Sequence, residues 1–268
     1  MPGDFNVNVN LPESSGEVVQ EAYRDAIKPA ATSTGNILKT VIDAVDAALS
    51  PLKVWTLKKN LQTSKAMNLV VEKLSQEDPQ LIGPPEPYIA VPALEYLSYS
   101  IDNEHLRNLY ANLLAKAMYE PTRQDVHPAF LEIIKQLSPI DADLFKFIYE
   151  LDRKPTITLG SLGDGKKHYN TGIPRVFPDL IPCVKYKYQT QQKSYSNLIR
   201  LGLISSESDF PYPDNEYDVI RKTVQYQECK KYLQEHYPDC EAKEYLASIV
   251  ISPLGHSFYE TCVRDSLK

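Results

Sequence analysis

The sequence predicts a mainly α protein, with an N-terminal helical bundle and a C-terminal winged-helix-like α/β domain. Apolar residues recur at helical spacing through residues 36–150, which is typical of packed amphipathic helices. From residue 154 onward glycines, prolines and tyrosines become frequent, and a helix is followed there by a strand pair and a further helix. We therefore expect an N-terminal arm with a short helix (1–35), a helical domain (36–150) and a winged-helix-like domain (151–268).

The composition is that of an ordinary globular protein, with 43% hydrophobic and 24% charged residues in a chain of 268. A net charge of −6 means that the whole molecule is not attracted to nucleic acid or to anionic lipid. The first residues lack the basic and apolar regions of a signal peptide, and the four cysteines form no C-x-x-C pair. We expect a cytoplasmic protein with reduced thiols and no cofactor.

The first 53 residues predict an arm and two helices. Phe5, Val7, Val9 and Leu11 alternate with asparagine, which fits either a short edge strand or an extended arm. Residues 17–27 are expected to be helical. Residues 36–53 form an almost entirely apolar helix with one narrow polar stripe, made by Lys39, Asp43, Asp46, Ser50 and Lys53.

Such an apolar helix is either buried in a bundle or membrane-active. Asp43 and Asp46 lie near its centre, and each would cost about 2.5–3.5 kcal/mol on insertion into a bilayer. The stripe carries no net charge, whereas interfacial helices are rich in Lys and Arg. A core helix is favoured, and a membrane is not an expected partner.

The next helix is expected at residues 53–76, with Leu57, Leu61, Val71 and Leu74 as its apolar positions. Its lysines are assigned to the solvent side: Lys58, Lys59, Lys65 and Lys73.

A helical hairpin is predicted between residues 84 and 120, after a proline cluster. Pro92 is placed in the first turn of a short helix that ends near Ser100. Asp102 is the expected N-cap of the second helix, and Glu104 lies in its first turn. One face of that helix should be buried: Leu106, Leu109, Tyr110, Leu113, Leu114 and Ala117.

Two more helices follow, at residues 130–137 and from Pro139 onward. Ser138 and Asp141 form a capping-box pattern at the start of the second one. Its buried face is expected to contain Ile140, Leu144, Phe147, Ile148 and Leu151.

The winged-helix pattern begins with a helix at 189–201 that Gly202 ends. Strands are expected at 203–206 and 247–251, with an unusually long insertion (207–245) that holds a helix near 221–236. Ser252 and Pro253 then open a last helix, whose inward residues are Leu254, Phe258 and Cys262.

The helix at 189–201 is a candidate nucleic-acid interface, since winged helices often place this helix in the major groove. Residues 165–206 contain seven Lys or Arg and one acid, Asp179. The tyrosines that could stack on bases are Tyr169, Tyr186, Tyr188 and Tyr195. The candidate binding residues are Lys185, Lys187, Gln192, Lys193, Tyr195, Ser196, Asn197 and Arg200. Winged helices also serve as protein-docking modules, so both readings stay open.

Three constellations resemble reactive sites, and each is better explained structurally. The Gly160–Lys167 run nearly matches a phosphate-binding loop but has Lys167 where the magnesium-binding hydroxyl belongs, which favours a glycine-rich hairpin. Cys229, His236 and Cys240 suggest a metal site, but Cys229 and His236 stand seven residues apart on one predicted helix, about 10 Å along its axis, too far for one zinc ion. A polar group near the hairpin has no nucleophile with a partnered base: Glu95, His105, Arg107 and Asn112.

The run IAVPALEYLSYSIDNEHLRNLYANLLAKAM resembles the signature of the bacterial abortive-infection alpha family. The likeness extends from about Asn36 to near the C-terminus, and the later segments SNLIRLGLI and SPLGHSFYETC agree with it. The resemblance implies a role in resistance to bacteriophage. It supplies no catalytic or binding residues.

Taken together, these observations predict a non-enzymatic phage-defence protein that acts through macromolecular contacts, with a protein or a phage component as partner. A winged-helix nucleic-acid-binding regulator is the first alternative and a membrane-active toxic effector is the second. Homo-oligomerisation stays open.

Overall fold

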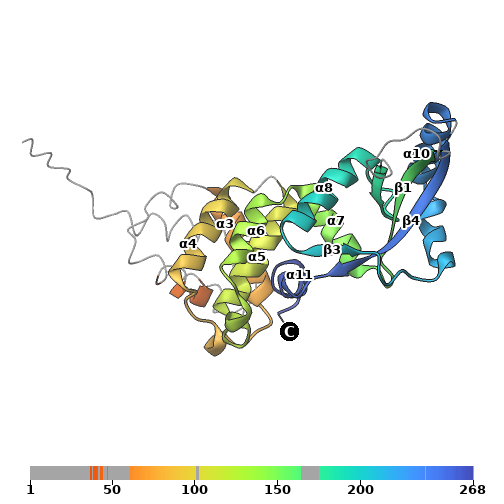
Figure 1. Ribbon diagram of the computed structural model, residues 1–268. Helices are drawn as coiled ribbons and strands as arrows, with labels where there is room; N and C mark the ends of the chain where they lie inside the picture. The colour runs from red at the N-terminus through yellow and green to blue at the C-terminus, as the bar shows by residue number, and fades with distance from the viewer. Residues whose placement is uncertain are drawn as a thin grey trace, which may run out of the picture.

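The computed structural model describes residues 61–100, 103–163, 175–238 and 240–267, together with seven residues between 37 and 47. The predicted arm at 1–35 lies outside the described residues, as do Leu57, Lys58 and Lys59. The fold is mainly helical, as expected, and contains a small four-stranded antiparallel sheet where the sequence predicted one pair of strands (Figure 1). The helices before residue 151 form a bundle, and the sheet with its covering helices forms the C-terminal α/β part.

Between residues 61 and 150, the described part of the bundle contains five α-helices joined by short turns. The helices are α3 (Leu61–Leu74), α4 (Pro87–Tyr99), α5 (Glu104–Met118), α6 (Ala129–Gln136) and α7 (Pro139–Glu150). Two 3-10 helices connect them, η3 (Pro79–Leu81) and η4 (Glu120–Asp125). The predicted capping box is confirmed, because Ser138 and Asp141 exchange hydrogen bonds at the start of α7. On α7, Leu144 and Ile148 are buried, while Ile140, Phe147 and Leu151 are half-buried.

Helix α5 is the centre of the bundle. It contacts α3, α4, α6 and α7 and the C-terminal segment of the chain. The sequence predicts one buried face, but every residue from Leu109 to Met118 is buried, including Asn112 and Lys116. The prediction was too narrow because neighbouring segments cover α5 on all sides. One of them is the C-terminal segment, which is more than 130 residues away in the sequence.

Two details of the hairpin differ from the prediction. Helix α4 starts at Pro87, so Pro92 lies inside it and not in its first turn. The carbonyl that loses a hydrogen bond to Pro92 belongs to Tyr88, whose side chain is 61% exposed. The N-cap of α5 is Asn103, whose side chain accepts from the Leu106 N–H at 3.2 Å; the expected cap, Asp102, is outside the described residues.

The described residues between 37 and 47 are helical and belong to the core. Ile37, Val41 and Ala44 are buried among residues of the bundle, whereas Lys39 and Asp43 of the predicted polar stripe are exposed. This agrees with the core-helix interpretation of residues 36–53. Within the described part of the chain, no helix is long and apolar enough to cross a membrane.

The sheet has the strand order β2-β1-β4-β3, with antiparallel neighbours throughout. Its strands are β1 (Pro155–Gly163), β2 (Arg175–Leu180), β3 (Ile204–Glu207) and β4 (Cys240–Ile251). Strand β4 begins seven residues before the predicted start at Ala247, because its first half pairs with β1 and only its second half pairs with β3. The predicted pairing of 203–206 with 247–251 is confirmed with Ile204 opposite Ile251.

Helices cover both faces of the sheet. Helix α8 (Tyr188–Arg200) lies between the sheet and the bundle, and Gly202 at φ +72° ends it, as predicted (Figure 1). The insertion supplies the cover of the opposite face, where Ile157, Leu159 and Leu180 pack in a separate apolar cluster. Its helices are α9 (Asp218–Arg221) and α10 (Val224–His236), preceded by the 3-10 helix η5 (Asp214–Tyr217).

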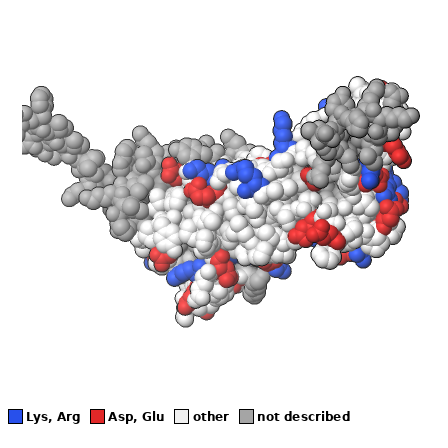
Figure 2. Space-filling model, in the orientation of Figure 1, with Lys and Arg blue, Asp and Glu red and all other residues white. Residues whose placement is uncertain are grey.

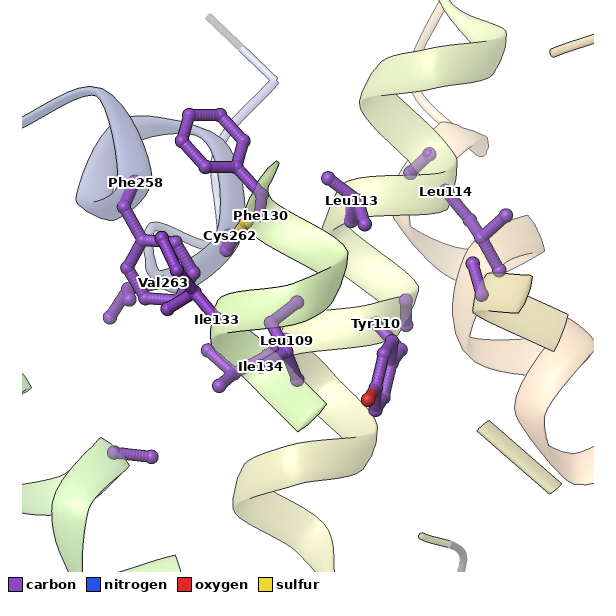
Figure 3. Close-up of a cluster of buried hydrophobic side chains, with 14 of the residues drawn as sticks. Leu109, Tyr110, Leu113, Leu114, Phe130, Ile133, Ile134, Phe258, Cys262 and Val263 are labelled. Carbon is purple, nitrogen blue, oxygen red and sulfur yellow. The ribbon is translucent and has the colours of Figure 1, made fainter. Parts of the chain in front are cut away.

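The C-terminal segment returns to the bundle and completes its core. Helix α11 (Pro253–Phe258) continues directly into a π-helix, η6 (Tyr259–Val263). Phe258 and Cys262 are fully buried, as predicted, and Figure 3 shows them beside Phe130 and Ile133 of α6. Leu254 was expected to point inward, but its side chain is 37% exposed and lies beside Gly202, at the end of α8.

One apolar cluster therefore runs through both parts of the chain. It contains residues of α3–α7 and also Tyr195 and Leu198 of α8, Ile204 of β3 and Ile251 of β4. The bundle and the sheet are held together by a common core.

Candidate functional site

Helix α8 carries most of the predicted nucleic-acid-binding residues, and its buried face decides which of them reach the surface. Gln191, Ser194, Tyr195 and Leu198 are buried against the sheet and α7. The opposite side of the helix exposes Lys193, Ser196 and Arg200, with Gln192 half-buried. Lys187, the residue before the helix, is also exposed.

Arg200 and Asn197 are engaged in contacts with the bundle. The Asn197 side chain donates to the backbone oxygen of Gln136 and to Oδ2 of Asp141, both at 3.0 Å. Arg200 donates to Oε1 of Gln136 and to Oδ1 of Asn197, both at 2.9 Å. Because Asp141 also caps α7, these four side chains join the end of α8 to the junction of α6 and α7.

Lys185 contacts α7 as well. Its Nζ lies 2.8 Å from Oδ2 of Asp143, and the hydroxyl of Tyr186 donates to the same oxygen at 2.8 Å. Burial alone would raise the pKa of Asp143, but the hydrogen bonds from Lys185 and Tyr186 hold it below its ordinary value. Lys185 is thus partly neutralised, while Lys187 and Lys193 have no ion pair among the described residues.

Tyr195 cannot take part in a surface site. Its side chain is 0% exposed, and burial raises the pKa of its hydroxyl well above the ordinary value. The prediction that Tyr195 stacks on a base is therefore wrong, because an i, i+3, i+4 pattern of Gln191, Ser194, Tyr195 and Leu198 turns this tyrosine to the sheet. Tyr186 and Tyr188 are half-buried, and Tyr169 lies outside the described residues.

The described surface has mixed charge. Figure 2 shows Lys and Arg side chains interspersed with Asp and Glu on the face it presents, with acidic side chains gathered near the end of β3. The exposed basic residues on α8 and just before it thus form a small group: Lys187, Lys193 and Arg200.

The three reactive-looking constellations fold as structural elements. Gly160–Gly163 belong to β1 and pair with Lys243–Cys240 of β4, so this part of the run is strand; Lys166 and Lys167 are not described. Cys229 is buried on α10, whereas His236 is exposed and stacks on Tyr232. Among the described residues, no group of His, Cys, Asp or Glu has the arrangement of a metal site.

The polar group near the hairpin is divided between the surface and the core. Glu95 and His105 are exposed, while Asn112 is buried and donates from Nδ2 to the backbone oxygen of Cys262 at 2.9 Å. Asn112 therefore serves the core of the bundle, whereas Glu95 and His105 lie at its surface.

Sequence reasoning missed a polar contact between α5 and the C-terminal segment. Lys116 donates from Nζ to the backbone oxygen of Glu260, one turn along α5 from Asn112. Burial lowers the pKa of Lys116, and the charge of Glu260 opposes that effect. Lys73 lies 3.0 Å from Asp265 and is 13% exposed, so its assignment to the solvent side was wrong. The i, i+4 spacing of Asn112 and Lys116 was visible in the sequence, but their backbone acceptors were not.

An acidic group fixes the insertion to the sheet. Arg221 binds Asp214, Asp218 and Glu244, at 2.6, 3.0 and 2.7 Å. The hydrogen bonds that the Arg221 guanidinium donates to these carboxylates raise its pKa, with Asp214 the largest cause and Glu244 the second. The arrangement is a structural ion-pair network at the edge of α9.

The family model for abortive infection alpha matches residues 57–262, which is most of the chain. Searches of curated proteins and of solved structures found no match.

Proposed function

Because the chain belongs to the abortive infection alpha family, we propose that it acts in bacterial defence against phage through contacts with other macromolecules, without catalysing a reaction. The expected partner is a host protein or a phage component, and the expected location is the cytoplasm. The family match carries the defence role, and the surface of the C-terminal half supports the mode of action.

The supporting observation is a set of large apolar side chains left in solvent. Phe210 is 79% exposed, and Val184, Val219 and Val224 are each more than half exposed. A large exposed phenyl ring is the kind of residue that anchors protein interfaces. All four lie in residues 184–224, in and before the insertion. In the described part of the bundle, Tyr88 has a similarly exposed side chain, at 61%.

A plaque assay tests this proposal. Bacteria that express the chain are challenged with a panel of phages, and the wild type is expected to reduce plaque number for at least one phage. The double variant Phe210→Ser, Val219→Ser should lose protection, while the matched Tyr88→Ser should keep it. Absence of protection across the panel would contradict the defence role, and full protection by the double variant would contradict contacts made through this surface.

A nucleic-acid-binding regulator is the second candidate. The strand order β1-β4-β3 with α8 across one face is compatible with a winged helix, and α8 exposes Lys193, Ser196 and Arg200 on one side. The engagement of Lys185, Asn197 and Arg200 with the bundle reduces the number of free contacts.

Titration of labelled DNA at several salt concentrations tests the second candidate. Binding should weaken steeply with salt and be reduced in Lys187→Ala, Lys193→Ala, while Lys230→Ala, Lys231→Ala on α10 serves as a charge-matched control. Equal binding by both double variants would exclude the α8 interface.

A further inference from the structure

We propose that the outer edge of β3 binds an extended, basic polypeptide segment as a fifth strand of the sheet. This inference rests on the proposed function, because it takes the partner to be a polypeptide. It adds which surface of this chain binds the partner and which chemistry the partner has. Strand β3 is the last strand in the order β2-β1-β4-β3 and pairs on one side only, with β4.

The backbone register shows which groups of β3 face outward. The Ile249 N–H donates to the Lys154 oxygen at 2.7 Å, so Ile249 faces β1. Because successive residues of a strand alternate in direction, Val250 faces β3 and pairs with Ser205. Ser206 lies opposite Ile249, and its own N–H and C=O therefore point away from the sheet. Among described residues, no backbone hydrogen bond outside the sheet reaches Ser206.

Two apolar side chains near β3 are exposed to solvent: Phe210, three residues after the strand, and Val250, which pairs with Ser205. The Ser248 hydroxyl is within 3.4 Å of the backbone oxygens of Glu207 and Phe210, which holds the turn after β3 over β4. The Phe210 ring nevertheless remains in solvent, and Val250 is also exposed on the same face of the sheet as Ser248. Val250 belongs to β4 and is separated from an added strand by β3. The Phe210 ring, three residues after the end of β3, therefore supplies the apolar part of the proposed contact.

The charge at the edge selects the partner. Glu207 and Asp209 are exposed and form no ion pair with a described residue, and Figure 2 shows acidic side chains gathered where Figure 1 draws the end of β3. Residues 207–218 contain five acids and no base. A strand with lysine or arginine at alternate positions would be attracted. A second copy of this chain would bring a second acidic segment to the same edge, so self-pairing is disfavoured.

Peptide binding tests the proposal on the full chain. The probe is a fluorescent hexapeptide of alternating lysine and valine, with a peptide of alternating glutamate and valine as its control, and anisotropy is the readout. We expect the basic peptide to bind at least about tenfold more tightly than the acidic one. Equal affinity for the two peptides, or dimerisation of the chain through β3, would overturn the proposal.

Variants separate strand addition from simple charge attraction. Ser206→Pro removes an outward N–H without breaking a bond to β4 and should weaken binding about tenfold, whereas Ser206→Ala keeps the N–H and should bind as the wild type does. Glu207→Lys, Asp209→Lys should weaken binding about tenfold, and Glu120→Lys, Glu235→Lys controls for net charge. Circular dichroism checks that each variant is folded. Unchanged binding by Ser206→Pro would overturn strand addition.

The plaque assay distinguishes this inference from the defence role. If Ser206→Pro loses peptide binding and also protection, both are supported. If it loses peptide binding but still protects against phage, the β3 edge binds peptide but has no part in defence. If Ser206→Pro keeps peptide binding, strand addition at β3 is overturned, whether or not the chain protects against phage.

Discussion

Asn112, in the middle of α5, donates a hydrogen bond to the backbone oxygen of Cys262, 150 residues later in the chain, at 2.9 Å. Both residues are buried. The bond satisfies a carbonyl at the end of a π-helix, where the backbone leaves acceptors without partners. It therefore fixes the C-terminal segment to the central helix of the bundle.

Asn112→Ala should lower the free energy of unfolding by about 1–3 kcal/mol, because it leaves the Cys262 carbonyl buried without its donor. Urea denaturation measures the change. Asn215→Ala replaces an exposed asparagine and should be nearly neutral. An equally stable Asn112→Ala protein would show that water or another donor satisfies the carbonyl.

Phe258→Ala should cost about 3–5 kcal/mol, since the ring is fully buried between Phe130 and Phe145, with centroids 5.7 and 5.8 Å away. Leu254→Ala on the same helix should cost much less, because Leu254 is partly exposed. Thermal and urea unfolding of the two variants gives the comparison. Similar losses would mean that α11 does not complete the core.

Gly255→Ala should destabilise the protein more than Gly202→Ala. A Cβ at Gly255 would lie 2.1 Å from the Leu203 carbonyl oxygen, which forces backbone to move. At Gly202 a Cβ would make only an ordinary van der Waals contact, 3.9 Å from Cδ2 of Leu254, and the positive φ of +72° is the unfavourable factor, at about 1–2 kcal/mol. Melting temperatures rank the two variants, and the reverse order would contradict the close approach of α11 to Leu203.

The Lys185–Asp143 contact should make stability depend on pH in the acid range. The pKa of Asp143 is lowered in the folded chain, so the contact stabilises above the ordinary carboxyl pKa of about 4 and is lost as pH falls through the folded value. The difference in unfolding free energy between wild type and Asp143→Asn should therefore shrink as pH falls below about 4. A difference that stays constant from neutral pH to acid would disprove this contribution.

Arg200→Ala should cost about 1–2 kcal/mol of stability, because it removes hydrogen bonds to Gln136 and Asn197. Lys193→Ala, on the same exposed side, should stay within about 0.5 kcal/mol of the wild type. Chemical denaturation measures both. If the two variants are equally stable, the hydrogen bonds of Arg200 to Gln136 and Asn197 contribute nothing to stability.

Local patterns predicted most helices and the strand pair at the C-terminus. Ser138 with Asp141, Gly202, and Ser252 with Pro253 each act within one turn, so their effect can be read without the rest of the fold. The start of β4 was misplaced because its first half depends on β1, a strand about 80 residues earlier in the chain. The surface site was only partly predictable, since helical spacing gave the exposed side of α8 but not the burial of Tyr195.

The sequence by itself determined the helical class, the caps and turns, and the family, because these depend on residues close together in the chain and on a long continuous motif. Only the tertiary structure decided which polar side chains are buried and which strand edge is left open. In the sequence alone, nothing distinguishes three polar residues from solvent-facing ones: Lys73, Asn112 and Lys116. In the structure their partners come from the other end of the chain, namely Asp265 and the carbonyl oxygens of Cys262 and Glu260. Burial is a property of the whole assembly of elements, and no local pattern specifies which distant segment will cover a given helix.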